Sequence, residues 1–310
     1  MTHNMILILK KIYWFLKDLY IFYLKKTGNW KRFADIRFHD AFGRYINWSN
    51  PKDLNEWINY FAYCTNTDLW VKCADKYAVR EYVKSKVGEH ILVPLLGKWD
   101  TVQDIDFDKL PNEFVIKPNN GSYDSVIVKD KSSVNVEYVR NKMQKALSAR
   151  FGLDSGEIHY LKMPPCIIAE ELLKTDNEHG LIDYKLWCFY GKPYAFFVCC
   201  DRDNVHHQVH YDYYTLDWER HPEKMSESYR HDIVLPKPKN LDKMIEYARL
   251  LSEDIPQVRV DFYDVDGQIY FGEMTFTSNQ GRMPFYTQDT LDELGMQLVK
   301  EKQEYEAKKK

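Results

Sequence analysis

A segment near the C-terminus, RVDFYDVDGQIYFGEMTFT, alternates polar and apolar residues on both sides of an Asp-Val-Asp-Gly turn. Because successive side chains of a strand point to opposite faces, Arg259, Asp261, Glu273 and Thr275 should share one face of a β-hairpin. Asp261 and Glu273 are equally far from the turn glycine, so we expect them to be near neighbours across the two strands. Two carboxylates this close repel each other unless a cation lies between them or water screens them. The pattern therefore predicts either a cation site or a solvated sheet face.

The segment EFVIKPNNGSYDSVIV predicts a strand, a turn and a second strand, and Lys117 stands at the end of the first strand. A phosphate group would suit this turn. The backbone at Gly121 can approach a ligand closely, Ser122 can donate a hydrogen bond, and Lys117 supplies positive charge. The segment matches neither the GxxxxGK[ST] nor the GxGxxG phosphate-binding pattern. An ordinary hairpin turn is the alternative interpretation.

A buried strand in CIIAEELL leads directly into two acids and two leucines. These four residues are Glu170, Glu171, Leu172 and Leu173. Exposed backbone groups near Leu173 could pair with the edge of an adenine ring. Further along the chain, DYK places Asp183 and Lys185 on the same side of a strand. Their side chains could reach ribose and phosphate oxygens, or they could form an ion pair at the surface.

The cluster VHHQVHYD contains His206, His207, His210 and Asp212, a set that invites a zinc hypothesis. The cluster lacks the HExxH spacing and lies in a polar segment that we interpret as a loop, so hydrogen bonding or solvent exposure is the favoured interpretation. The sequence has no GxSxG motif and no cysteine beside a plausible base. Covalent nucleophilic catalysis is therefore not indicated.

The elements that must position these residues are short β-rich runs mixed with helical segments. The β-rich runs are FVIKP, SVIVKD, CIIAEELL, YKLWCFY and PYAFFVCC. Helical patterns cover residues 48–87, residues 136–151 and the segment LDKMIEYARLLSED. Strands and helices do not alternate strictly, so we expect α+β lobes with antiparallel sheets.

The composition is that of a soluble globular protein of about two domains. The 310 residues include 43 basic and 46 acidic side chains, and this balance argues against nucleic acid as a partner. The six cysteines form no CxxC pair, which favours reduced thiols and a cytoplasmic location.

The first segment of the chain, residues 5–26, predicts a basic amphipathic helix. Its lysines and one aspartate fall on one half of the helix, and its apolar side chains fall on the other half. The apolar residues are Met5, Leu9, Ile12, Leu16, Leu19 and Tyr23. The internal charges make it a poor transmembrane span and a poor secretory signal. Such a helix could lie on the cytoplasmic face of the inner membrane, pack on its own domain, or contact a second subunit.

The order of the motifs DKYAVREYV, FVIKPNNGS, IIAEELL, DYK and RVDF…GEMTF resembles an ATP-grasp enzyme. The chain resembles in particular the TupA-like ATP-grasp proteins, a family named for teichuronopeptide biosynthesis and associated with capsular and cell-surface polysaccharides. The likeness runs from NPKDLNEW, near Asn50, to Gly295. It implies an α+β ATP-grasp fold in which two lobes clasp ATP. The expected divisions are a helical extension at 1–70, a lid lobe at 71–173 and a catalytic lobe at 174–310.

The resemblance also implies the roles of individual residues. The expected ATP-binding residues are Lys76, Lys117, Gly121, Ser122, Glu170, Glu171, Leu172, Leu173, Asp183 and Lys185. Asp261 and Glu273 would be magnesium ligands, and Arg259 would lie beside the reacting carboxyl group. One departure concerns Thr275, which stands where ATP-grasp enzymes usually have asparagine, although its hydroxyl can still offer an oxygen to Mg²⁺.

The family resemblance implies an ATP- and Mg²⁺-dependent ligase that forms an acyl phosphate and then an amide. We expect it to attach an amino acid or amino sugar to a uronic-acid-type carboxylate of a surface glycan precursor. Arg259, Lys185 and Arg202 are the expected catalytic residues, and Arg202 and the Tyr211-Asp212 region are candidates for acceptor contact. The alternatives are a glycosyltransferase and a non-catalytic nucleotide-binding scaffold at the membrane. Assembly into a homo-oligomer is left open.

Overall fold

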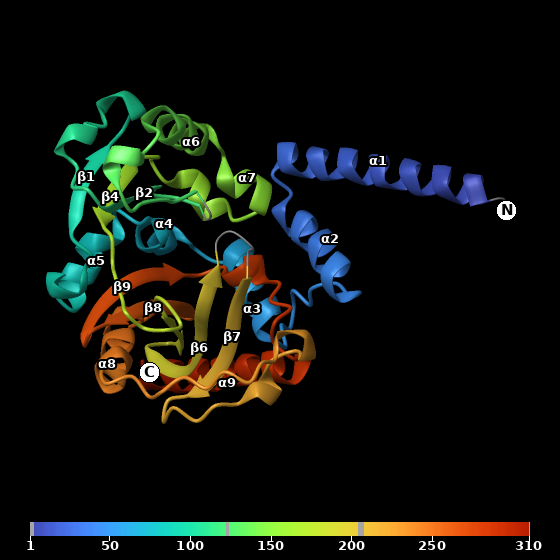
Figure 1. Cartoon of the computed structure of the whole chain (residues 1–310). Coiled ribbons are helices and arrows are strands. Elements are labelled where there is room, and N and C mark those ends of the chain that lie inside the picture. Colours follow the sequence, from blue (N-terminus) through green and yellow to red (C-terminus); the bar gives the residue numbers. More distant parts are fainter. Residues whose placement is uncertain (1–2, 122–123, 204–207, 310) are drawn as a thin grey trace.

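The computed structural model describes residues 3–121, 124–203 and 208–309. It contains a smaller lobe, a larger lobe and a helical arm that extends away from both (Figure 1). The helices are α1 (His3–Thr27), α2 (Trp30–Phe42), α3 (Leu54–Cys64), α4 (Asp68–Ala74), α5 (Val79–Lys86), α6 (Val136–Ser148), α7 (Phe151–Ser155), α8 (Leu241–Leu251) and α9 (Gln288–Lys308). The strands are β1 (Leu95–Trp99), β2 (Phe114–Pro118), β3 (Val126–Val128), β4 (Ile167–Glu171), β5 (Asp183–Phe189), β6 (Lys192–Asp203), β7 (Gln208–Thr215), β8 (Val258–Val265) and β9 (Gln268–Thr275).

The smaller lobe contains an antiparallel sheet in the order β1-β4-β2-β3. The alternation in FVIKP explains β2, because Phe114 and Ile116 are buried in the core while Lys117 is only half-buried. Helix α6 contributes Val139 and Met143 to the same core. The sheet therefore leaves Lys117 on the face opposite its apolar core.

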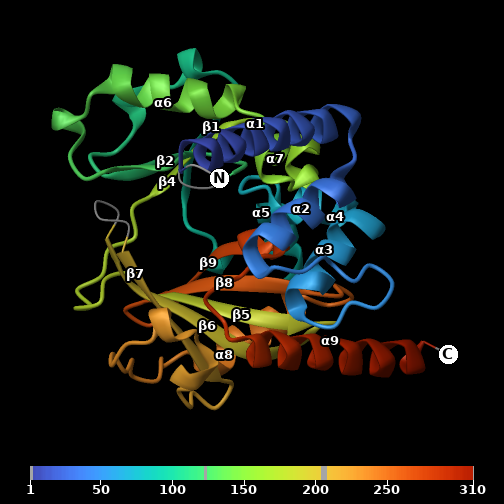
Figure 2. The ribbon, with the colours of Figure 1, turned by 90° about the vertical axis from the view of Figure 1, so that its right-hand side faces the viewer.

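The larger lobe contains an antiparallel sheet in the order β7-β6-β5-β8-β9. Strand β5 lies at its centre, and every residue of this strand is buried. Helices α8 and α9 lie on the side of the sheet that faces away from the smaller lobe (Figure 2). Two antiparallel sheets with mixed helices confirm the α+β class that the sequence predicted.

Helices α3, α4 and α5 lead from the arm to the smaller lobe, and they pack on the larger one. Trp70 of α4 and Val83 of α5 belong to the hydrophobic core of the larger lobe. The segment after residue 70 therefore contacts the larger core before the chain enters the smaller sheet. The expected boundaries at 70 and 173 stay a prediction.

Helix α1 confirms the predicted helix and projects from the body of the molecule (Figure 1). Its apolar side chains are strongly exposed, and Phe15 reaches 69%. Near its C-terminal end, Leu24 is buried, Lys17 pairs with Asp40 of α2 and Lys25 pairs with Asp154 of α7. Among the described residues, no helix is long and apolar enough to cross a membrane.

Three local predictions were wrong or incomplete. Lys76 was expected on a helix, but it lies in the turn between α4 and α5, where Asp75 accepts hydrogen bonds from two backbone amides. The helical pattern over residues 48–87 corresponds to three separate helices. The polar segment around His210 was interpreted as a loop, but it forms β7, the edge strand of the larger sheet. An edge strand tolerates polar residues on both faces, so its alternation is weak.

Candidate functional site

The β8–β9 hairpin has the register that its alternation predicted. Asp261 lies opposite Glu273, and Arg259 lies opposite Thr275. The other face is apolar and buried, with Phe262 completely inaccessible to solvent. A β-bulge follows the Asp261–Glu273 pair and shifts the register toward the turn.

Asp261 is the most deeply enclosed carboxylate of the site, with 1% of its surface exposed. Arg259 donates to both of its oxygens, each over 2.8 Å, and Lys185 of β5 donates to Oδ2 over 2.6 Å. Burial alone would lower the pKa of Lys185, but the carboxylates of Asp183 and Asp261 raise it above its ordinary value. This lysine therefore stays charged, and the three side chains form a fixed ionic group on the sheet.

Glu273 is the accessible carboxylate, since 45% of its side chain is exposed. Its Oε1 atom accepts hydrogen bonds from Thr275 Oγ1 over 3.0 Å and from Arg259 Nη2 over 3.4 Å. Burial raises the pKa of Glu273, but the charges of Lys185, Lys76 and Arg259 outweigh it and lower the value to about 2. Glu273 is therefore ionised at neutral pH and faces solvent in a positively charged surrounding.

The oxygen atoms of this face suit a magnesium ion. Mg²⁺ in nucleotide enzymes is usually held by one or two carboxylates together with substrate phosphates and water. Asp261 and Glu273 supply two carboxylates in register, and the Thr275 hydroxyl lies 3.0 Å from Glu273. These residues fit the ion, with Glu273 as the ligand that solvent can reach.

Across from the hairpin lie two lysines, Lys117 of the smaller sheet and Lys76 of the turn between α4 and α5. Lys76 donates to the backbone oxygen of Gly121 over 2.7 Å, and Lys117 pairs with Glu170 over 2.6 Å. Arg80 of α5 takes the other oxygen of Glu170 at 3.0 Å. Lys76 and Glu273 are close enough for each charge to affect the pKa of the other. The two lobes therefore bring the expected phosphate lysines to the expected metal face.

A narrow pocket lies between the lobes and joins these groups. Its lining residues are Lys76, Val79, Arg80, Leu92, Val93, Lys117, Glu170, Phe271 and Gly272. Sequence reasoning missed Arg80 and the apolar walls formed by Leu92 and Phe271. The DKYAVREYV motif carried the signal for Arg80, but its partner Glu170 is distant in sequence. Phe271 lies next to the β-bulge, where the register shifts, so alternation alone does not predict which face of the sheet it occupies.

The turn after β2 is built around Asn119, which is fully buried. Its side chain donates to Asp75 over 2.6 Å and accepts from the Cys166 amide over 2.8 Å. Gly121 has a left-handed backbone with φ of 79°, which favours glycine. These contacts tie the Lys76 turn to the loop after Lys117. Ser122, the other residue expected to bind phosphate, lies outside the described residues.

The segment that was expected to meet adenine begins at the end of β4. Glu170 points to the two cations described above, Glu171 is exposed, and the Glu171 amide donates to the Pro94 oxygen over 3.1 Å. Leu172 and Leu173 follow as half-buried residues in the connection between β4 and β5. Their role toward adenine stays a prediction.

Asp183 and Arg202 lie beside Lys185 rather than in the pocket. Asp183 is buried, and its Oδ2 atom contacts Lys185 Nζ at 3.3 Å and Arg202. Arg202 is 48% exposed at the margin of the site, so it is still available to a substrate. Asp212 is buried and pairs with Arg220. The ribose role of Asp183 and the acceptor role of Asp212 are untested predictions, and both carboxylates already have partners within the protein.

The histidine cluster is only partly described. His210 Nδ1 lies 3.2 Å from Asp201 Oδ2, and the neighbouring Cys200 thiol lies 3.6 Å from the same oxygen. His206 and His207 lie outside the described residues. The contacts of His210 agree with the hydrogen-bonding interpretation that the sequence favoured.

A buried histidine beside Trp70 gives a prediction for stability. His159 is 1% exposed, its Nε2 atom has no hydrogen-bond partner among the described residues, and burial lowers its pKa from 6.5 to about 3. Below pH 6.5 the unfolded chain therefore binds a proton that the folded chain excludes, and stability falls as the pH drops toward 3. We expect a loss of roughly 1 kcal/mol per pH unit in this window.

Urea unfolding at a series of pH values measures this slope. The His159→Phe variant keeps a ring against Trp70 but cannot titrate, so its stability should depend less steeply on pH between about 6 and 4. Equal slopes in the parent and the variant would show that His159 is not the group responsible.

The sequence matches the family described as TupA-like ATPgrasp over residues 57–299. A search of curated protein sequences gave no significant match. Among solved structures, D-alanine–D-alanine ligase from Bacillus anthracis shows 17% identity and a TM-score of 0.40, over 74% of this chain and 70% of that chain. D-cycloserine synthetase DcsG shows 14% identity and a TM-score of 0.43, over 80% and 78% of the two chains. The ATP-grasp ligase PsnB, solved with a phosphomimetic variant of its minimal precursor, Mg and ADP, shows 11% identity and a TM-score of 0.40, over 80% and 66%.

Proposed function

Because the chain belongs to the TupA-like ATP-grasp family and is an ATP-grasp ligase, we propose that it joins the carboxylate of a sugar acid to an amine. The acid is a uronic-acid-type group of a cell-surface polysaccharide precursor, and the amine is an amino acid or an amino sugar. ATP and Mg²⁺ are the proposed cofactors. The family name supports the polysaccharide context, and the arrangement of charges supports the use of ATP.

One observation carries the proposal. Lys76 and Lys117 line one pocket together with Gly272, the residue before the accessible carboxylate Glu273, and the charges of Lys76 and Glu273 affect each other's pKa. A nucleoside triphosphate needs cations along its phosphates and carboxylates for its metal ion. The lysines of the pocket and the two acids of the hairpin offer both. The alternative interpretation, a polar sheet face that only contacts water, gives no reason for Lys76 and Lys117 to line a pocket beside it.

The side chains suggest the following division of labour. Lys76 and Lys117 would hold phosphate oxygens, and Asp261 and Glu273 would hold Mg²⁺, which would neutralise charge on the transferring phosphoryl group. Arg259 is oriented by Asp261 and could stabilise charge as the carboxylate oxygen attacks the γ-phosphorus of ATP, the bond to the bridging oxygen breaks and ADP leaves, which gives the acyl phosphate. Closure of the lobes excludes water, so that the amine rather than water attacks the acyl carbon and releases phosphate.

Hydroxylamine trapping tests this reaction. With ATP, Mg²⁺ and a panel of uronic acids, the full chain should form a hydroxamate and release ADP and phosphate in equal amounts. A glycosyltransferase would leave ATP untouched, and a binding scaffold would release neither product. Recovery of a phosphorylated hydroxyl group without free phosphate would contradict the ligase assignment while keeping the ATP site.

Helix α1 suggests where the ligase acts. Its exposed apolar side chains and its lysines match a helix that lies in an anionic lipid surface. We propose peripheral attachment to the cytoplasmic face of the membrane, with the rest of the protein in the cytoplasm. Leu24, Lys17 and Lys25 anchor the end of the helix to the body, so the preceding turns are the lipid-binding part.

Removal of residues 1–16 should abolish binding to anionic vesicles and leave ATP affinity unchanged. The deletion removes most of the exposed apolar face but keeps Lys17 and Leu24, which contact the body. Vesicle sedimentation and nucleotide titration measure the two quantities. A Lys10→Glu, Lys11→Glu variant controls for charge and should bind more weakly, because each lysine near an anionic surface contributes about 1 kcal/mol. A stable dimer that buries α1 in lipid-free buffer would argue against the membrane role.

A further inference from the structure

The end of β6 contains a β-bulge. The register between β6 and β7 shifts between Cys200 and Asp203, and Asp201 has a left-handed backbone with φ of 49°. A bulge re-aims side chains, so two successive residues need not point to opposite faces of the sheet. Here the Cys200 Sγ atom lies 3.6 Å from Asp201 Oδ2. A left-handed aspartate costs free energy and persists only where the surrounding contacts enforce it.

Three segments of the chain meet at the Asp201 carboxylate. Cys200 and Asp201 come from β6, and His210 of β7 places its Nδ1 atom 3.2 Å from Asp201 Oδ2. His179, in the connection between β4 and β5, places its Nδ1 atom 3.0 Å from Oδ1 and 3.2 Å from Oδ2. The His179 backbone oxygen also accepts from the Asp201 amide over 3.0 Å. Oδ2 is therefore the oxygen that the thiol and the His210 imidazole share, and His179 is nearest to Oδ1.

Asp201 has no permanently charged partner in the described protein. Within residues 3–121, 124–203 and 208–309, its carboxylate pairs with His179 and His210, and no lysine or arginine lies at ion-pair distance. A neutral imidazole brings no positive charge to a carboxylate. Solvent reaches the group, because 27% of the Asp201 side chain and 44% of the His210 side chain are exposed. A cation from solution can therefore approach these side chains and offset the negative charge.

The distances are close to those between the ligands of one tetrahedral zinc ion. Zinc–sulfur bonds are about 2.3 Å long and zinc bonds to nitrogen or oxygen about 2.0–2.2 Å, so ligands at tetrahedral angles lie about 3.3–3.6 Å apart. Asp201 Oδ2 lies 3.6 Å from Cys200 and 3.2 Å from His210, and ligand atoms of all three residues lie within 4.8 Å of one another. A hydrogen bond accounts for the histidine contact alone. A thiol, an imidazole and a carboxylate at one point are a ligand set that zinc prefers.

We propose that Cys200, Asp201 and His210 bind a zinc ion at the edge of the larger sheet. The ligand atoms are Cys200 Sγ, Asp201 Oδ2 and His210 Nδ1, and water takes the fourth position on the exposed side. His179 is a positioning residue, because its imidazole holds Oδ1 and so orients the carboxylate. The buried Cys200 thiol releases its proton when the metal binds. Of the cluster VHHQVHYD, only His210 belongs to this ligand set.

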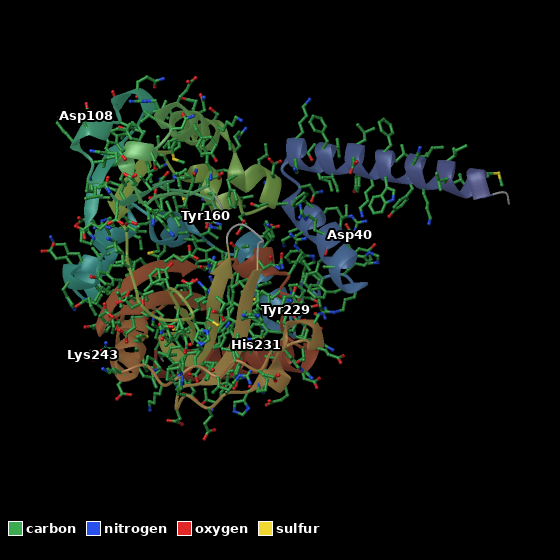
Figure 3. The ribbon with its side chains drawn as sticks, viewed as in Figure 1. Asp40, Asp108, Tyr160, Tyr229, His231 and Lys243 are labelled. Carbon is green, nitrogen blue, oxygen red and sulfur yellow. The ribbon has the colours of Figure 1, made fainter. Side chains whose placement is uncertain are left out.

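The surroundings of the zinc site connect it to the rest of the larger lobe. Figure 3 labels His231 beside β7, and the rings of His231 and His210 pack with their centroids 4.8 Å apart. This contact limits the movement of the His210 ring. Arg202 follows Asp201 directly in the chain and pairs with Asp183 of β5. A metal ion on Asp201 therefore fixes the end of β6 from which Arg202 extends.

Cobalt substitution tests the ligand set without requiring turnover. Co²⁺ replaces Zn²⁺ in tetrahedral sites, and a bound thiolate then gives a charge-transfer band in the near ultraviolet. The full chain is reduced, freed of metal with a chelator and titrated with Co²⁺ in excess Mg²⁺, which competes for sites made only of oxygen ligands. The wild type should show the thiolate band and the strong visible bands of a four-coordinate ion. An equimolar amount of Zn²⁺ should abolish both.

Substitutions of the ligands and of the positioning residue should have different effects. Cys200→Ser should lose the thiolate band, and His210→Gln should weaken Zn²⁺ binding by at least about a hundredfold in competition with a zinc-binding dye. His179→Gln should weaken binding by about tenfold and keep the band, because it removes the group that orients the carboxylate and not a ligand. A wild type without the thiolate band, or a Cys200→Ser variant that keeps it, would overturn the proposal.

Cys64→Ser and His90→Gln are the matched controls, because Cys64 is partly exposed on α3 and His90 is exposed after α5. Both should bind Zn²⁺ as the wild type does. A variant with His206→Gln and His207→Gln should also keep the band and the affinity. Loss of binding in that variant, together with full binding by His210→Gln, would overturn the assignment of His210. Zn²⁺ should raise the Tm of the wild type and not that of His210→Gln. None of these measurements uses ATP, so they test the zinc site independently of the proposed ligase reaction.

Discussion

Glu273→Gln is expected to fold as the parent does and to lose turnover by about a hundredfold or more, which corresponds to about 3 kcal/mol of transition-state stabilisation. Glu273 is the accessible carboxylate of the face that we propose to hold Mg²⁺, and the surrounding cations keep it ionised. The amide keeps the size of the side chain and removes its charge, so a hard cation is held less tightly. Initial rates at several Mg²⁺ concentrations measure the loss.

Glu246→Gln is a suitable control, since Glu246 is exposed on α8. It should retain full activity. The Glu273→Gln variant should also need more Mg²⁺ for half-maximal rate, and its urea midpoint should stay near that of the parent. Near-normal activity with unchanged Mg²⁺ dependence would rule out Glu273 as a metal ligand.

Asp261→Asn is expected to lose both activity and stability, and its free energy of unfolding should fall by about 3–5 kcal/mol. Asp261 is buried and accepts hydrogen bonds from Arg259 and Lys185, so the substitution leaves two buried cations without full compensation. Equilibrium unfolding in urea measures the change.

Asp266→Asn provides the comparison on the same hairpin. Asp266 is exposed in the turn and has a left-handed φ of 53°, a conformation that asparagine adopts readily. Its stability and activity should both match the parent. If Asp261→Asn were as stable as this control, the three-residue ionic group would not be a structural part of the sheet.

The two acids of the hairpin show what alternation can predict. Period-2 patterning and the turn fixed which residues face each other, and the structure has Asp261 opposite Glu273. Alternation does not report how deeply each side chain is enclosed. That depends on Lys185 from β5, which comes from a distant part of the sequence, and on the smaller lobe that covers Glu273 only in part. Asp261 and Glu273 look equivalent in the sequence, but in the folded protein Asp261 is buried and the Glu273 side chain is exposed to solvent.

Other parts of the site needed long-range contacts that no local pattern contains. Motif order pointed to Lys76 and Lys117, but it did not point to Arg80, whose partner Glu170 comes from a distant strand of the smaller sheet. The amphipathic pattern of α1 predicted its helix, since that signal is local, and did not predict its projection into solvent.

The pairing of Lys117 with Glu170 has a consequence for how nucleotide affinity is measured and tuned. An anion that binds Lys117 must displace the carboxylate of Glu170. The observed binding free energy is therefore the difference between the Lys117–anion and the Lys117–Glu170 interactions. Glu170→Gln removes the competing negative charge. It should therefore tighten phosphate binding at Lys117 and weaken the contact between residue 170 and Arg80. A substitution at Glu170 can therefore change the affinity for nucleotide without changing Lys117 itself.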